Sequence, residues 1–196
     1  MTLNELIAEV YTLTNRPDLT AETLSAIKAA TLKAHRSDFY SKDIYETGIS
    51  FGSLEYRQGL DYITLISNFR AFKYLRKADS AIDDTGVFFT VITPEEVIDS
   101  YGKNRTDIAY VAGRTLEMRS STLFQYGLLG CYVLPIVTTN GYSSWVAEQN
   151  PFAIIYEACR VIFKSIGYDQ QSSTFTGLLS EEYELLKMSA VADVGY

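Results

Sequence analysis

The sequence predicts an α+β protein in which helices from both ends of the chain pack together, with a β-rich insertion between them. Apolar residues recur every three or four positions near both ends, which is typical of amphipathic helices. Aromatic and β-branched residues punctuated by glycines fill the middle, as in strands and turns. No break in composition separates these parts. We therefore expect a single domain over residues 1–196, with a helical hairpin over 1–38, a β-rich insertion over 39–142, C-terminal helices over 143–188 and a tail over 189–196.

The N-terminal hairpin opens with a capping pattern. Thr2 and Glu5 have the spacing at which each side chain can accept a hydrogen bond from the other residue's backbone amide, so a helix should begin here and end near Thr14. Pro17 lies in a polar segment that breaks this helix. Thr20 is placed to cap a second helix. Because the connection is short, we expect the two helices to form an antiparallel hairpin.

Several strands and one short helix are expected in the central insertion. Residues 87–91 form a compact strand candidate, and residues 107–119 predict a hairpin around Gly113 and Arg114. Residues 70–77 fit a strand or a helix, and their periodicity does not decide between the two. A hydroxyl cap, a proline and two glutamates predict a short helix near residues 94–101.

The C-terminal helices have the clearest local signals. Ser143 or Ser144 offers a side-chain oxygen to a helix start, and Pro151 suits a first helical turn because its missing N–H would have no partner there. Gly167 should end this helix in the left-handed conformation, before a second, acidic helix begins. One apolar face is predicted from Ile154, Ile155, Ala158, Val161, Ile162 and Ile166.

Composition excludes several classes of protein. The net charge of −7 argues against a packaging factor that grips DNA, because phosphate binding depends on Lys and Arg. No apolar run approaches the roughly 20 residues that cross a bilayer, and the first residues lack a signal-peptide pattern. We expect a soluble protein made in the cytoplasm, with no membrane partner. Cys131 and Cys159 should be free, buried thiols. The basic cluster, expected to be solvated or to pair subunits, comprises Arg57, Arg70, Lys73, Arg76 and Lys77.

Catalytic patterns are scarce. His35 is the one histidine, and because Ser37 and Asp38 are too close in sequence to form a triad with it, we expect a surface or capping histidine. We expect no metal site and no cofactor, since neither vicinal cysteines nor a phosphate-binding loop occurs. Acidic pairs such as those in 83–84, 95–96 and 181–184 suit capping or solvated roles. The chain is therefore expected not to be an enzyme, with a small carboxylate-dependent hydrolase as an alternative.

Tyrosine is unusually abundant, with 15 Tyr beside 10 Phe. A tyrosine combines a large apolar ring with a polar hydroxyl, so it serves both in sheet packing and in interfaces that stay soluble before assembly. If part of this set forms interfaces, the candidate residues for contacts with other subunits or with a tail are Tyr40, Tyr45, Tyr56, Tyr142 and Trp145.

Three stretches carry a resemblance to a known family. They are LTNRPDL at 13–19 with the helix that follows it, FRAFKYLR at 69–76 together with YVLP at 132–135, and SWVA at 144–147 with the two helices after it. Together they resemble the head-to-tail adaptor proteins of tailed bacteriophages, also called connector or head-completion proteins, especially those of short-tailed phages.

This resemblance implies a structural virion protein at the head-tail junction. Such a protein would form a homo-oligomeric ring, typically dodecameric, that joins the portal protein to tail proteins such as a nozzle, hub or fibre. DNA would only pass through its channel during genome ejection. The C-terminal segment 189–196 would dock on the portal, through Val191, Val194 and Tyr196. Another tail component, such as a tail-tube or tail-completion protein, is the nearest alternative.

Overall fold

The computed structural model describes residues 1–78 and 86–192, and its contacts divide the chain into two compact units. The helical unit contains Met1–Asp43 and the chain from Leu134 onward, and the β unit is Ile44–Val133. The α+β class is as predicted. The β unit lies within the predicted insertion 39–142 and is shorter, and Tyr40 and Tyr142 pack against the core of the helical unit.

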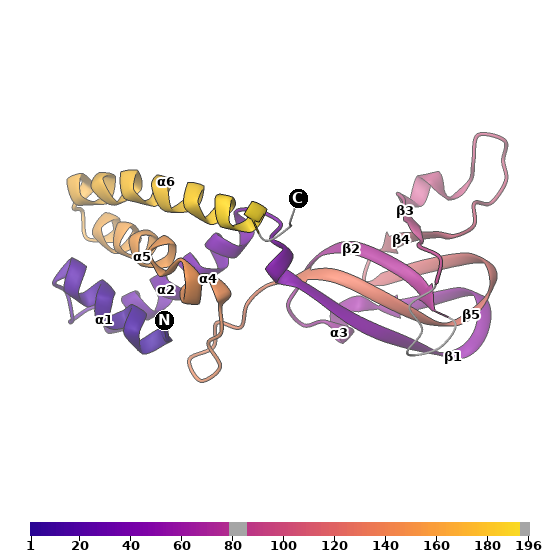
Figure 1. Cartoon of the computed structure of the whole chain (residues 1–196), viewed down its shortest axis with the longest axis horizontal. Coiled ribbons are helices and arrows are strands. Elements are labelled where there is room, and N and C mark those ends of the chain that lie inside the picture. Colours follow the sequence, from indigo (N-terminus) through magenta and orange to yellow (C-terminus); the bar gives the residue numbers. More distant parts are fainter. Residues whose placement is uncertain (79–85, 193–196) are drawn as a thin grey trace. The chain divides into compact units, whose positions relative to one another are not determined.

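The helical unit is organised around one central helix. Helix α5 contacts α1, α2, α4 and α6, and Figure 1 shows α6 running alongside it. The core of this unit is therefore built from segments that the whole β unit separates in sequence. Its elements are α1 (Leu3–Thr14), α2 (Thr20–Arg36), a 3-10 turn η1 (Ser41–Asp43), α4 (Trp145–Gln149), α5 (Pro151–Ser165) and α6 (Asp169–Ala192).

The predicted start of α1 is confirmed, whereas the predicted cap of α2 is wrong. The Thr2 amide donates to Glu5 Oε2 at 2.7 Å, and the Glu5 amide donates to Thr2 Oγ1 at 3.3 Å. The N-cap position of α2 is occupied by Leu19, which has no side-chain acceptor, and Thr20 is already helical. Its hydroxyl instead donates to the Pro17 carbonyl at 3.3 Å.

The predicted features of α5 are present in the structure. Pro151 occupies the first helical position, and Gly167 has a φ of +80° just beyond the helix, where a residue with a side chain would be strained. Most of the predicted apolar face is buried against α1, α2 and α6, although Val161 stays exposed. Helix α6 follows and extends to Ala192, four residues into the segment predicted as a tail.

The β unit is one sheet centred on its longest strand. β5 pairs with β1 along one edge, and along the other edge with β4 near its start and β2 near its end, all antiparallel. β3 pairs with β4 in parallel. The elements are β1 (Ile44–Asp61), a single turn α3 (Tyr62–Leu65), β2 (Phe69–Ala78), β3 (Thr90–Val91), a 3-10 turn η2 (Pro94–Val97), β4 (Ile108–Ala112) and β5 (Thr115–Val133).

Most of the predicted central elements occur, with changed lengths. The β4–β5 hairpin turns at Gly113, whose φ of +64° at the first central position suits a type II′ turn. Residues 70–77 are a strand, because they pair with β5. The strand expected over 87–91 is limited to β3, and the helix expected near 94–101 is the turn η2, whose Thr93 and Glu96 form a capping box.

The sheet has its own apolar core, separate from that of the helical unit. Phe51 and Phe124 pack edge to face at 5.7 Å between ring centroids, and Tyr62 packs between Phe69 and Phe72. The remaining core side chains come from every described strand except β3 and include Ile49, Leu75, Ala109, Leu116, Met118, Leu129 and Cys131.

Candidate functional site

His35 is buried, contrary to the expected surface or capping role. It lies in the last turn of α2 and is 1% exposed. Its Nδ1 is 2.7 Å from Asp43 Oδ1, and its Nε2 is 2.9 Å from Ser144 Oγ. The neighbours that the sequence suggested, Ser37 and Asp38, take no part in these two bonds. Asp43 is eight residues from His35 and Ser144 is 109 residues away, so no short sequence pattern connects all three.

The hydrogen bonds fix the direction of each donor. A carboxylate only accepts, so His35 Nδ1 carries the hydrogen, and in the neutral ring Nε2 then accepts a proton from the Ser144 hydroxyl. Ser144 is also the N-cap of α4, where its Oγ accepts from the Ala147 amide at 3.2 Å. A serine hydroxyl has one hydrogen and two lone pairs, so both bonds can exist together.

Asp43 is held by a second donor. The Trp145 indole Nε1 donates to Asp43 Oδ1 at 2.7 Å, and Oδ2 is buried without a hydrogen-bond partner among the described residues. The Trp145 ring packs edge-on against His35 and Tyr40, at 5.5 and 5.2 Å between centroids. We call Ser144, His35, Asp43 and Trp145 the Ser144 cluster. It joins the end of α2, the turn η1 and the start of α4.

Of the predicted contact residues, Trp145 belongs to this cluster, and Tyr40 and Tyr142 lie beside it. Tyr40 is 1% exposed, so it belongs to the core and cannot meet a partner, while Trp145 and Tyr142 are half-buried. Large aromatic rings are typical of interfaces, but in this unit the rings of Tyr40 and Trp145 pack around the polar groups of the Ser144 cluster. Tyr45 and Tyr56, in β1, are 49% and 55% exposed.

The predicted portal-docking residues cannot be placed. The side chain of Val191 and the whole of Val194 and Tyr196 lie outside the described residues.

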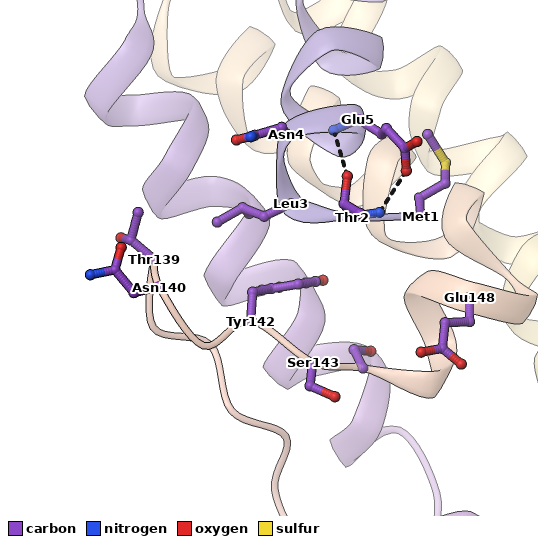
Figure 2. Close-up of a pocket in the computed structure, with 11 residues that line it drawn as sticks. Met1, Thr2, Leu3, Asn4, Glu5, Thr139, Asn140, Tyr142, Ser143 and Glu148 are labelled. Atoms are coloured by element: carbon purple, nitrogen blue, oxygen red, sulfur yellow. Dashed lines mark hydrogen bonds between the residues drawn. The ribbon is translucent and has the colours of Figure 1, made fainter.

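A cavity of about 470 Å³ lies beside Ser144 within the helical unit. Figure 2 shows the Tyr142 ring extending across it below the start of α1, with Glu148 at one side. The Tyr142 hydroxyl is 2.8 Å from Thr31 Oγ1. Burial raises the pKa of Tyr142, against the opposing effect of its hydrogen bonds with Thr31 and Ser144, so this phenol stays protonated at neutral pH. The other lining side chains include Thr2, Asn4, Glu5 and Asn140.

On the side opposite α1, the cavity is lined by a loop that is hydrogen-bonded to α2. The Ser143 amide donates to the Ile136 carbonyl at 2.9 Å, which closes the loop, and Lys28 Nζ donates to Thr139 Oγ1 at 3.0 Å. With Tyr142 bonded to Thr31, the loop contacts α2 at two points one turn apart. The cavity therefore has a defined wall on this side.

Glu157 is a further buried ionisable group of the helical unit. It lies in α5, 3% exposed, where Lys33 contacts it at 2.8 Å and Arg160 at 2.7 Å. Burial alone would raise the pKa of Glu157, but hydrogen bonds from Arg160 and Lys33 hold it below the usual value. Both cations are supplied within the unit, so this site is a satisfied structural ion pair.

Other candidate chemistry is absent from the described part of the chain. Within it, no group of three metal-ligating side chains comes together, and no helix is long and apolar enough to cross a bilayer. Glu96 serves as a cap, as expected, and the acidic pair 83–84 lies outside the described residues. Cys131 and Cys159 are free and buried, as predicted, and burial raises the pKa of Cys159 to about 12.

Comparisons with protein-family models and with curated proteins find no match for this chain.

Proposed function

We propose that this protein is a head-to-tail adaptor, a structural virion protein that forms a ring between the portal and the tail and extends the DNA exit channel. The proposal joins the resemblance of three sequence stretches to surfaces in both units that suit assembly. A tail-tube or tail-completion protein is the alternative within virion components, and a small carboxylate-dependent hydrolase is the alternative among enzymes.

The observation that carries the proposal is that α6 has two apolar faces. One face is inward, where Leu179 and Leu186 are buried. The other consists of Leu178, Leu185 and Met188, which are 38%, 52% and 68% exposed. On a helix of 3.6 residues per turn the two faces are centred roughly 120° apart. A helix needs one apolar face to pack in its own unit, so the second face is available for another chain.

Exposed apolar side chains in the β unit offer a second surface. Leu54, Tyr56 and Leu123 are each about half exposed, at 57%, 55% and 46%. Leu54 and Tyr56 lie in β1 where its pairing with β5 shifts register, between Ser50 and Arg57. Strand irregularities of this kind re-aim side chains and end pairing, so they suit a contact with a different protein. We assign this surface to the tail.

The charge of the chain suits a channel. A net charge of −7 gives DNA little to bind, so a passing genome would meet no strong attraction. Two members of the basic cluster already have partners in the β unit: Lys73 lies over the Tyr132 ring, and Lys77 contacts Thr122. These contacts favour a basic cluster that pairs with protein groups over one that binds DNA.

The test is size-exclusion chromatography with light scattering on the protein alone and with the portal protein of the same phage. We expect a ring with the portal, and loss of that ring in the double variant Leu185→Glu and Met188→Glu. The double variant Ser173→Glu and Ser180→Glu is the matched control, because it adds the same two negative charges to α6 at exposed positions away from the outer face.

Truncation before residue 189 removes the predicted docking tail together with the last four residues of α6 and leaves Leu178, Leu185 and Met188 in place. We expect portal binding to be lost in the truncated protein, since the resemblance places Val191, Val194 and Tyr196 at that contact. A full-length protein that does not bind the portal and binds only tail proteins would contradict the proposal and support a tail-tube or tail-completion role.

A further inference from the structure

We propose that Ser144 is a base-activated nucleophile and that the cavity beside it accepts a small polar ester or amide, whose acyl group Ser144 takes. The inference stands on the geometry of the Ser144 cluster and is independent of the adaptor proposal.

The cluster contains the three roles that nucleophilic acyl transfer requires. The nucleophile Ser144 Oγ is 2.9 Å from the base His35 Nε2, and the base is 2.7 Å from the orienting carboxylate Asp43. Nucleophile and base must be within about 2.6–3.2 Å for proton transfer, and the base must itself be oriented by a third group. Such triads are recognised by geometry and not by chain position.

The surroundings hold the base in the tautomer that the reaction uses. Asp43 accepts from both His35 Nδ1 and Trp145 Nε1, so its oxygen is fixed and the Nδ1 hydrogen stays in place. Nε2 is then free of hydrogen and faces the serine hydroxyl.

The capping role of Ser144 does not compete with this one. The Ala147 amide uses a lone pair of Oγ, whereas the base uses its hydrogen. Ser143 provides the contrast, because it also lines the cavity and is exposed, yet its side chain makes no hydrogen bond among the described contacts. Of the two adjacent serines, only Ser144 is paired with a base.

The cavity sets the class of substrate. Its volume of about 470 Å³ lies within the roughly 300–1,000 Å³ of small-molecule sites. Hydroxyl and amide groups from Thr2, Asn4, Asn140 and Tyr142 line it. Glu5 and Glu148 add two negative charges, and the Met1 ammonium, which donates to the Ala147 carbonyl, adds one positive charge. These groups favour a polar substrate that is neutral or cationic, and they disfavour an anionic one.

The reaction balances without any further reactant except water. Ser144 Oγ bonds to the carbonyl carbon as its proton passes to His35 Nε2. The bond from that carbon to the leaving oxygen or nitrogen breaks, and the leaving group takes the proton from Nε2. Water then attacks the acyl ester, gives one proton to Nε2 and releases the acid, and the proton returns to Ser144 Oγ.

The experiment treats the full-length protein with diisopropyl fluorophosphate and locates the adduct by mass spectrometry of intact protein and peptides. We expect one phosphoryl adduct, on Ser144, with fluoride displaced. Ser180→Ala, which changes an exposed serine of α6 that does not line the cavity, should be labelled like the wild type. His35→Ala should be labelled at least about 100-fold more slowly, since a positioned general base contributes roughly that much or more.

Two results would overturn the inference. One is a folded wild-type protein that gains no adduct on Ser144 when a serine esterase in the same tube is fully labelled. The other is labelling of Ser144 at an unchanged rate in a His35→Ala protein whose near-ultraviolet circular dichroism is native. If His35→Ala does not fold, the wild-type result decides alone.

Discussion

The helical unit and the β unit are stabilised in different ways. In the helical unit, polar pairs with at least one buried side chain join segments far apart in the chain: His35 to Ser144, Lys33 to Glu157 and Thr31 to Tyr142. In the β unit, backbone pairing with β5 joins the strands, and the core is mainly apolar and aromatic. A unit assembled from two ends of a chain gains specificity from directional side-chain pairs, whereas a sheet obtains its register from the backbone ladder.

Each unit contains one free, buried cysteine, so the reactivity of each thiol reports on the opening of its own unit. Cys159 lies in α5 and Cys131 in β5, and burial raises the pKa of each thiol. A buried thiol reacts with a thiol reagent only when its surroundings open. The labelling rates of the two cysteines therefore measure the opening of the two units separately, in one sample.

Asp43→Ala should have the largest effect, and it should be confined to the helical unit. The change leaves the His35 and Trp145 donors buried without an acceptor, which we expect to cost about 3 kcal/mol at roughly 1–3 kcal/mol for each unsatisfied group. Cys159 labelling should accelerate by two orders of magnitude or so, while Cys131 labelling stays unchanged. The control is Asp38→Ala, at an exposed aspartate five residues earlier.

Equal acceleration at both cysteines in Asp43→Ala would contradict separate stabilisation of the two units, because it would mean that the two units open together.

Gly130→Ala should have the converse effect. A Cβ at this position would lie 2.4 Å from the Tyr74 ring, which covers Gly130 and donates its hydroxyl to Glu46. The ring must move, so we expect a loss of about 1–3 kcal/mol, as for other overpacked sites. Cys131 should then label faster and Cys159 should not. Gly52→Ala is the control, since nothing lies within 4 Å of its added Cβ.

Glu157→Gln should make the stability of the helical unit less dependent on pH. The pKa of Glu157 is lowered in the folded protein, so its ionised form contributes stability above the unfolded value near 4.5, and this contribution is lost as pH falls through the lower folded value. Glu157→Gln should therefore unfold more easily than the wild type at pH 7. The difference should shrink as the pH falls below about 4.5. Urea unfolding followed by the fluorescence of Trp145, the one tryptophan of the chain, at pH 7 and at lower pH measures it, and a difference independent of pH would contradict the assignment.

Thr2→Ala should have the smallest effect. It removes one side of the capping box at α1, which typically costs about 1 kcal/mol. Thermal unfolding of the helical unit should shift downward by a few degrees, and the β unit should not respond. Thr12→Ala is the control, because Thr12 is exposed within the same helix and caps nothing. An equal shift in both variants would remove the capping explanation.

Local signals in the sequence were sufficient for much of the secondary structure. The capping box at Thr2, the proline at 151, the glycine at 167 and the 113–114 turn each depend on residues within one turn of each other, and each is present in the structure. The free state of both cysteines also followed from spacing alone. Where a signal was shared by two structures, as for residues 70–77, pairing with β5 decided it.

Tertiary packing decided what spacing could not. His35 was assigned to the surface because its sequence neighbours offered no triad, yet the fold brings Asp43 and Ser144 to its two nitrogens. Tyr40 carries the same aromatic signal as Tyr45, but one is in the helical core and the other is exposed on a strand. Caps and turns arise from hydrogen bonds a few residues apart, so the chain specifies them locally. Contacts that span more than 100 residues depend on how whole elements pack, and no short pattern records them.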